Sequence, residues 1–325
     1  GCSLMVGEPI EAGGVGTPCR SESDCHQSHC SEGLCVTSCV SNSECPHGAF
    51  CWDKECHLPL HVSAFYDGLA TEGEGWTWGH HQALTTVAGD LGYIRLQTTQ
   101  NIDATTLSVP MENAVASGAR VIVATSLSLE APVQQAAKRH PDVHFMVATA
   151  STWIAGPNLT TYQGRSETAF YVAGKLATQR ATSRIGLILT TPHPRVISEA
   201  NAFALGAMAS RPGIKIEVRW LGYWLDPNTA PTFSGPGHPL FLEELLTSRF
   251  LDSGCQVVAQ LDDTSRSAKY IEAAQPAGLP PSVYSLRRND RYGWRDPVTL
   301  EPRRTCLGSV YYDWTPQYVR VFDGI

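Results

Sequence analysis

Two tryptophans and two histidines crowd residues 75–82, which read Gly-Trp-Thr-Trp-Gly-His-His-Gln. This stretch follows a short apolar run at residues 61–65 and a turn rich in glycine and acidic residues. In an α/β protein, the loop after the first strand opens onto the ligand crevice at the carboxyl end of the sheet. Large aromatic side chains gain little from core packing there, so we interpret Trp76 and Trp78 as walls for a flat ligand.

Two aspartates follow apolar runs further along the chain and are placed to meet the edge of a flat ligand. Asp263 comes after residues 255–260, and Asp290 comes after residues 282–286. This combination suits a flat ligand that carries N–H groups at its edge, because a carboxylate accepts hydrogen bonds from such groups. We interpret Asp262 as a solvated neighbour of Asp263.

Eight of the eleven cysteines lie between positions 19 and 56. Such dense spacing is typical of a disulfide framework in a segment too small to build a core, and it indicates an oxidising compartment. Zinc binding is the alternative, because some spacings come near those of zinc knuckles. The sequence favours disulfides without choosing the pairing among Cys19, Cys25, Cys30, Cys35, Cys39, Cys45, Cys51 and Cys56.

A further cysteine, Cys2, stands apart from this cluster. The run Gly1-Cys2-Ser3 resembles the cleavage end of a bacterial lipoprotein signal, where the cysteine becomes the acylated first residue of the mature protein. The glycine-rich residues 3–18 would then form a flexible tether. The alternative is a ninth framework cysteine, although the other eight already pair evenly. We therefore expect a lipid anchor at Cys2, on the periplasmic face of the membrane in a bacterial cell envelope.

Size and charge exclude several classes of protein. The chain has 325 residues and a net charge of −7, which allows two core-building domains and an appendage. Its basic residues are scattered rather than clustered, so nothing indicates a nucleic-acid partner. No apolar stretch reaches the roughly 18–20 residues that a membrane-spanning helix needs.

From residue 61 onward, short strand-like runs alternate with helical patterns, which is typical of parallel βαβ units. A break near residues 157–161 favours two doubly wound lobes. The last helical pattern, at 317–322, ends close to residue 325, so we expect the natural chain to continue. Strands are expected at 62–65, 92–97, 120–125, 143–148, 184–189, 214–220, 255–260 and 282–286, and helices at 80–88, 106–117, 131–138, 166–179, 197–210, 241–248 and 265–274.

Several segments of the chain carry a likeness to known proteins, and they are residues 75–80, 124–126, 157–162, 164–165, 171–174, 201–207, 220, 223–227, 258–260, 263 and 289–290. Together they resemble one family, the basic membrane protein (Bmp) type of substrate-binding lipoprotein of ABC transporters. The likeness is strongest to members that bind purines and purine nucleosides. At position 81 the family has an aspartate where this chain has His81, and Arg287 and Arg288 precede Asp290 where the family has a small polar residue. These departures leave the exact ligand open.

The resemblance implies an α/β protein with the type I periplasmic-binding-protein fold. Two Rossmann-like lobes with parallel sheets would close on a ligand between them, preceded by the small disulfide-rich segment. The expected divisions are a tether at 1–18, the Cys-rich segment at 19–59 and a binding domain at 60–325, with lobe 1 at about 61–160 and 297–325 and lobe 2 at about 161–296.

The function implied is that of a monomer that captures a purine base or nucleoside and delivers it to an ABC transporter permease. No catalysis, cofactor or metal is expected. A ligand-sensing receptor of the same fold and a periplasmic nucleoside hydrolase remain alternatives, although the chain has neither a His-Glu-x-x-His nor a Gly-x-Ser-x-Gly motif. The ligand contacts expected are Trp76, Trp78, His80, Thr125, Ser126, Asn201, Trp224, Asp263 and Asp290.

Overall fold

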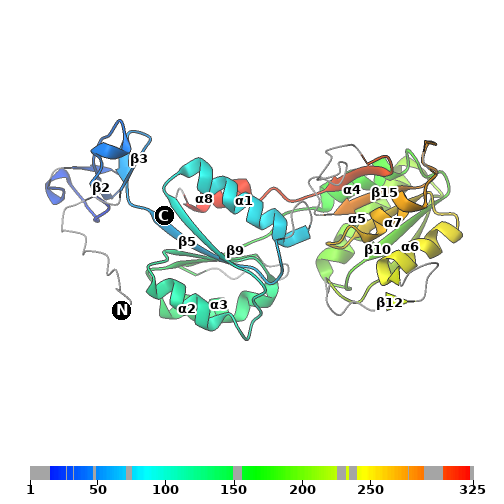
Figure 1. The fold of residues 1–325 in the computed structure, drawn as a ribbon, viewed down its shortest axis with the longest axis horizontal. Helices are drawn as coiled ribbons and strands as arrows, with labels where there is room; N and C mark the ends of the chain where they lie inside the picture. Colours follow the sequence, from blue (N-terminus) through cyan, green and yellow to red (C-terminus); the bar gives the residue numbers. More distant parts are fainter. Residues whose placement is uncertain are drawn as a thin grey trace.

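The computed structural model contains two lobes, each built on a five-stranded parallel sheet, and a Cys-rich segment (Figure 1). The three parts lie in a row, with lobe 1 in the middle and the Cys-rich segment at the end away from lobe 2. The expected α/β class, with two parallel sheets behind a disulfide segment, is confirmed. The structure describes residues 15–26, 28–31, 33–46, 49–70, 75–148, 156–224, 232–233, 240–276, 278–288 and 303–322.

Lobe 1 has the strand order β6-β5-β7-β8-β9. Apolar side chains cover both faces of the central strands, which is why α1 and α8 pack on one face while α2 and α3 pack on the other. The elements are β5 (Leu60–Phe65), α1 (Gly75–Leu91), β6 (Ile94–Thr99), α2 (Ser108–Ala116), β7 (Val121–Ala124), η3 (Leu127–Leu129), α3 (Glu130–Arg139), β8 (His144–Ala148), β9 (Leu159–Tyr162) and α8 (Thr315–Phe322).

Lobe 2 repeats this plan with the order β11-β10-β14-β15-β16. Helices α4 and α5 pack on one face of its sheet, and α6 and α7 pack on the other. The elements are α4 (Glu167–Ala177), β10 (Arg184–Leu189), α5 (Pro194–Ser210), β11 (Lys215–Trp220), the hairpin β12 (Thr232–Phe233) and β13 (Leu240–Phe241), α6 (Leu242–Asp252), β14 (Val257–Leu261), α7 (Arg266–Ala274), β15 (Tyr284–Arg288) and β16 (Cys306–Val310).

Two strands in these sheets have no counterpart among the expected ones. Strand β9 closes the edge of sheet 1, and β16 joins sheet 2 beside β15. The chain therefore passes to lobe 2 at residues 163–166 and returns at 311–314, later than the expected positions near 160 and 297. Strand β9 was not expected because it is only four residues long and lies at the break near residues 157–161, and β16 contains a glycine, which is depleted in strands.

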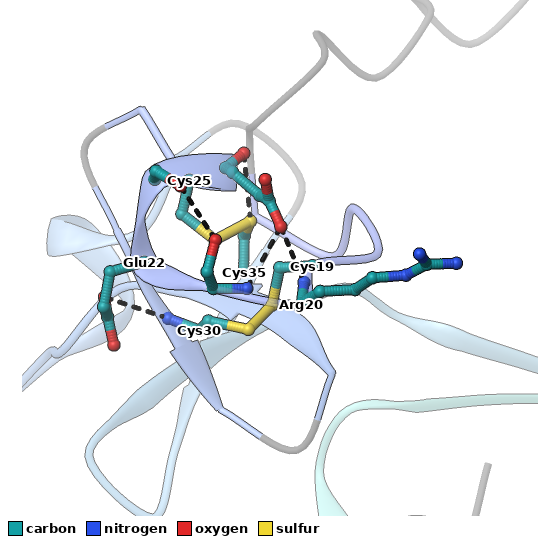
Figure 2. Close-up of a disulfide and its surroundings, with 9 residues drawn as sticks. Cys19, Arg20, Glu22, Cys25, Cys30 and Cys35 are labelled. Carbon is teal, nitrogen blue, oxygen red and sulfur yellow. Dashed lines mark hydrogen bonds between the residues drawn. A yellow bond between two sulfur atoms is a disulfide. The ribbon is translucent and has the colours of Figure 1, made fainter.

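The Cys-rich segment holds four disulfides, so the disulfide interpretation is confirmed and its zinc alternative is wrong. The segment consists of two consecutive modules, each with a 3-10 turn and a hairpin, and in each the first cysteine pairs with the third and the second with the fourth. Figure 2 shows the first module. The pairs are Cys19–Cys30, Cys25–Cys35, Cys39–Cys51 and Cys45–Cys56, around η1 (Glu22–Asp24), β1 (His29–Ser31), β2 (Leu34–Val36), η2 (Asn42–Glu44), β3 (Phe50–Trp52) and β4 (Glu55–His57).

The second module rests on lobe 1 through two ring contacts. The Arg95 guanidinium lies 4.1 Å from the centre of the Phe50 ring. The rings of His57 and Tyr93 stack with their centres 5.8 Å apart. Strand β5 begins three residues after β4, so the segment is also joined to the lobe by a short connection. Among the described helices, none combines the length and apolar character needed to cross a bilayer.

Candidate ligand site

The stretch rich in tryptophan and histidine forms the start of α1, which corrects the expectation that these residues lie in a loop. The helix begins at Gly75, whose φ of 91° is a left-handed value that glycine adopts without strain. A Cβ at this position would lie 3.3 Å from the backbone oxygen of Asp263 in lobe 2. The first residue of α1 therefore touches the other lobe. Trp76 and His80 are four residues apart, so they share one face of the helix.

Trp76 is held firmly in place on the lobe 1 side. Its indole Nε1–H donates to the backbone oxygen of Thr125 at 2.5 Å. Its ring meets the ring of Trp314 edge to face at 5.2 Å and that of Tyr312 at 5.5 Å. Thr125 itself is fully buried at the end of β7, so its contribution is a backbone oxygen that orients the indole.

His80 lies inside this aromatic cluster and is fully buried. Its ring stacks on Trp314 at 4.4 Å, and a hydrogen bond of 2.6 Å joins its Nδ1 to the Tyr318 hydroxyl. Burial, with a smaller effect from the positive charge of Arg195, holds the pKa of His80 well below its usual value. The imidazole is therefore neutral, and it packs behind Trp76.

Lobe 2 contributes Arg195, the second residue of α5, and Trp224, which follows β11. The centre of the Arg195 guanidinium lies 4.9 Å from the Trp76 ring centre and 5.4 Å from that of Trp224. One flat cationic group thus contacts a tryptophan from each lobe. The Arg195 Nη1–H group also donates to the Tyr312 hydroxyl at 3.3 Å, and that hydroxyl donates to Glu199 at 2.8 Å.

Two carboxylates approach each other near the same end of α1. Asp67 follows β5 in lobe 1, and Asp263 follows β14 in lobe 2. The Asp67 side chain is exposed, but many protein atoms lie around its carboxylate and reduce its hydration. This desolvation raises its pKa; the negative charge of Asp263 adds to that effect, and a hydrogen bond from Ser126 opposes it. Gly75 lies against Asp263 after β14, and Trp76 donates to Thr125 after β7, whose N–H in turn donates to the last residue of β5. The carboxyl ends of β5, β7 and β14 therefore lie at the start of α1.

The remaining three expected ligand contacts are Trp78, Asn201 and Asp290. The Trp78 ring meets that of His81 at 5.8 Å. Trp78 lines a pocket of about 160 Å³ between α1 and the crossover at 311–315, and Trp76 lines the same pocket. Asn201 is exposed in the middle of α5. Asp290 lies outside the described residues.

Asp262 is not the solvated residue that we expected. Its side chain is only 1 % exposed, because it follows the fully buried strand β14 and lies within lobe 2 near Glu243. The interpretation of Asp262 as a surface neighbour of Asp263 is therefore wrong.

Asp67 and Arg195 were not among the residues expected at the site, although the sequence carries a signal for both. Each follows an apolar strand at the carboxyl end of a sheet, which is the position that singled out Asp263. Tyr312 and Trp314 gave no such signal, because their part in the site depends on where the chain returns to lobe 1.

Residues 60–235, more than half of the chain, match the family described as ABC transporter substrate-binding protein PnrA-like, or Bmp. The chain belongs to the Bmp family. Two curated relatives are similar to it. A putative ABC transporter glucose-binding protein of Haloferax volcanii is 28 % identical over 75 % of this chain. A purine-binding protein of Brucella abortus is 26 % identical over 77 % of it. The matches span 56 % and 65 % of the two relatives' own lengths.

Solved structures share the fold of this Bmp-family protein. A solute-binding protein of an ABC transporter system from Conexibacter woesei has a TM-score of 0.61 at 17 % identity, covering 81 % of this chain and 80 % of that one. One from Aeropyrum pernix has a TM-score of 0.66 at 15 % identity, covering 82 % and 71 %. At these identities the likeness concerns the fold alone, and it confirms the periplasmic-binding type.

Proposed function

We propose that this Bmp-family protein captures a purine base or nucleoside between its lobes and delivers it to the permease of an ABC transporter. The observation that supports this is the pair Trp76 and Trp224, one from each lobe, in contact with the same flat guanidinium. A purine ring is flat and offers π-faces to such aromatic walls. Asp67 and Asp263 supply carboxylates for ring or ribose hydrogen-bond donors, and Ser126 orients Asp67. His80 and Thr125 support Trp76 from behind.

The two curated relatives carry names with different ligands, so the decisive experiment compares a purine with a sugar. Calorimetry on the full chain would use inosine, adenosine and glucose. We expect the nucleosides to bind and glucose not to bind, because the tryptophan pair offers extended faces to a ring system. Binding of glucose alone would overturn the purine assignment.

The contribution of stacking can be measured with two matched variants on α1. Trp76→Ala should weaken nucleoside binding by about 1–3 kcal/mol through lost stacking. Trp78→Ala removes the same kind of side chain two residues along the helix, where the ring contacts His81 and not Arg195, and should weaken binding less. Equal losses in the two variants would contradict the assignment of Trp76 as the ligand wall.

We also propose that a lipid on Cys2 holds the protein at the periplasmic face of the membrane. Residues 1–14 lie outside the described part of the chain, so the proposal is motivated by the run Gly1-Cys2-Ser3 and the oxidising compartment that the four disulfides indicate. Release of a Cys2→Ser variant from the membrane fraction tests it.

A further inference from the structure

Arg195 occupies a position that local electrostatics disfavours. It is the second residue of α5, where the helix dipole presents partial positive charge and favours anions over cations. Residues that break a local rule are expected mainly at functional sites. In this chain the arginine reaches across to the other lobe, where its guanidinium meets Trp76.

The Arg195 guanidinium also carries a hydrogen-bond donor that is not satisfied. Its Nε is buried and has no hydrogen-bond partner among the residues that the structure describes. Its Nη1 reaches only the Tyr312 hydroxyl, at a long 3.3 Å. A buried N–H without an acceptor is unfavourable, so an acceptor brought by a ligand would be bound strongly at this point.

Asp263 would supply hydrogen-bond acceptors for a ligand to which Arg195 supplies donors. The backbone of Asp263 lies against Gly75, the residue before Trp76, while Arg195 lies over the Trp76 ring. A ligand bound beside Trp76 would therefore lie between the N–H donors of Arg195 and the residue Asp263, whose carboxylate is an acceptor. We propose that Arg195 is the specificity-determining residue of this site and that it selects 6-oxopurines, the guanine and hypoxanthine class, over adenine. This inference rests on the proposed function.

The chemistry of the two ring classes gives the reason for this choice. A 6-oxopurine presents two adjacent acceptors, O6 and N7, and arginine binds such an edge through two of its N–H groups. Its N1–H is a donor that suits a carboxylate, which only accepts. Adenine carries an amino donor at position 6 and an acceptor at N1. It would place donor against donor at Arg195 and acceptor against acceptor at Asp263.

Inosine and adenosine test the proposal, because they differ only in the groups at positions 6 and 1. By calorimetry on the full chain, inosine should bind roughly tenfold or more tightly than adenosine, since a donor left unpaired in a buried site is costly. In Arg195→Met, which keeps an unbranched apolar stem without donors, inosine binding should weaken until the preference is lost. Arg195→Lys keeps the charge but not the planar fork, and should restore only part of the preference.

Asn201→Ala is the control, since Asn201 is exposed in the middle of the same helix as Arg195 and its removal should leave the ratio of the two affinities unchanged. A ratio that stays the same in Arg195→Met would overturn the proposal. So would equal strengthening of both nucleosides in that variant, which would mean that the guanidinium only fills the space. If the wild-type protein binds neither nucleoside, the proposed function itself fails and this inference fails with it.

Discussion

Asp262 is an acid held among other acids inside lobe 2. The charge that acts on it most strongly is that of Glu243, a fully buried carboxylate that pairs with Arg266 at 3.1 Å and accepts a hydrogen bond from the Tyr223 hydroxyl at 3.1 Å. One Asp262 oxygen accepts from Thr264, and the other has no hydrogen-bond partner in the described part of the chain. Desolvation, strengthened by the charge of Glu243, raises the pKa of Asp262 to about 7.

This raised pKa predicts a loss of stability as the pH increases. The folded state keeps the Asp262 proton up to about pH 7, whereas an unfolded aspartate releases it near pH 4. The free energy of unfolding therefore falls between these two values. Asp262→Asn removes this dependence, so its melting temperature should rise relative to wild type between pH 5 and pH 8.

Melting curves of the ligand-free proteins at several pH values would measure this gain. The control is Asp90→Asn, an exposed aspartate on α1, which should show no pH-dependent gain. A constant difference between Asp262→Asn and wild type at every pH would contradict the prediction.

At the scale of elements, two glycines allow α4 and α5 to cross with their backbones in contact. A Cβ at Gly174 would collide with the backbone oxygen of Phe203, and one at Gly206 would collide with that of Tyr171. Neither obstacle is a flexible side chain that could move aside. The packing of this face of lobe 2 therefore depends on both positions being glycine.

Gly174→Ala should destabilise the protein by about 1–3 kcal/mol, because the two helices must move apart. Gly89 in α1 offers a matched control: it is an exposed helical glycine with open space around its Cα. Gly89→Ala should stabilise by about 0.5–1 kcal/mol through helix propensity. Urea unfolding of both variants would measure the effects, and changes of the same sign would refute the packing argument.

The local pattern of apolar and polar residues made much of this fold predictable from the sequence. Strand β10 has the expected bounds, 184–189, because five consecutive buried residues leave an unbroken apolar run. Asp263 could be placed near the cleft because a carboxyl end of a strand is visible in sequence. The contact of Arg195 with Trp76 could not be found in this way. It joins residues that lie more than a hundred positions apart and in different lobes. Sequence periodicity does not encode how the crossovers at 163–166 and 311–314 place the lobes.

At the scale of the whole molecule, strand β5 links two separate regions. Its first residue, Leu60, follows the Cys-rich segment, and beyond its last residue, Phe65, lies Asp67 in the candidate ligand site. The segment and lobe 2 lie on opposite sides of lobe 1 (Figure 1). An attachment that precedes the Cys-rich segment would therefore leave the space between the lobes open to ligand.

This arrangement predicts that anchoring and ligand binding are independent. If Cys2 carries the lipid, a Cys2→Ser variant produced in the native host should move from the membrane fraction to the soluble fraction. Bacterial lipoproteins carry more than one acyl chain, and removal of a multiple-chain anchor abolishes stable attachment. The affinity of the variant for inosine should equal that of the wild type. Cys306→Ser in lobe 2 is the control and should stay with the membrane. A Cys2→Ser variant that remains in the membrane fraction after a carbonate wash would disprove the anchor, and one that is released but binds inosine more weakly would disprove the independence.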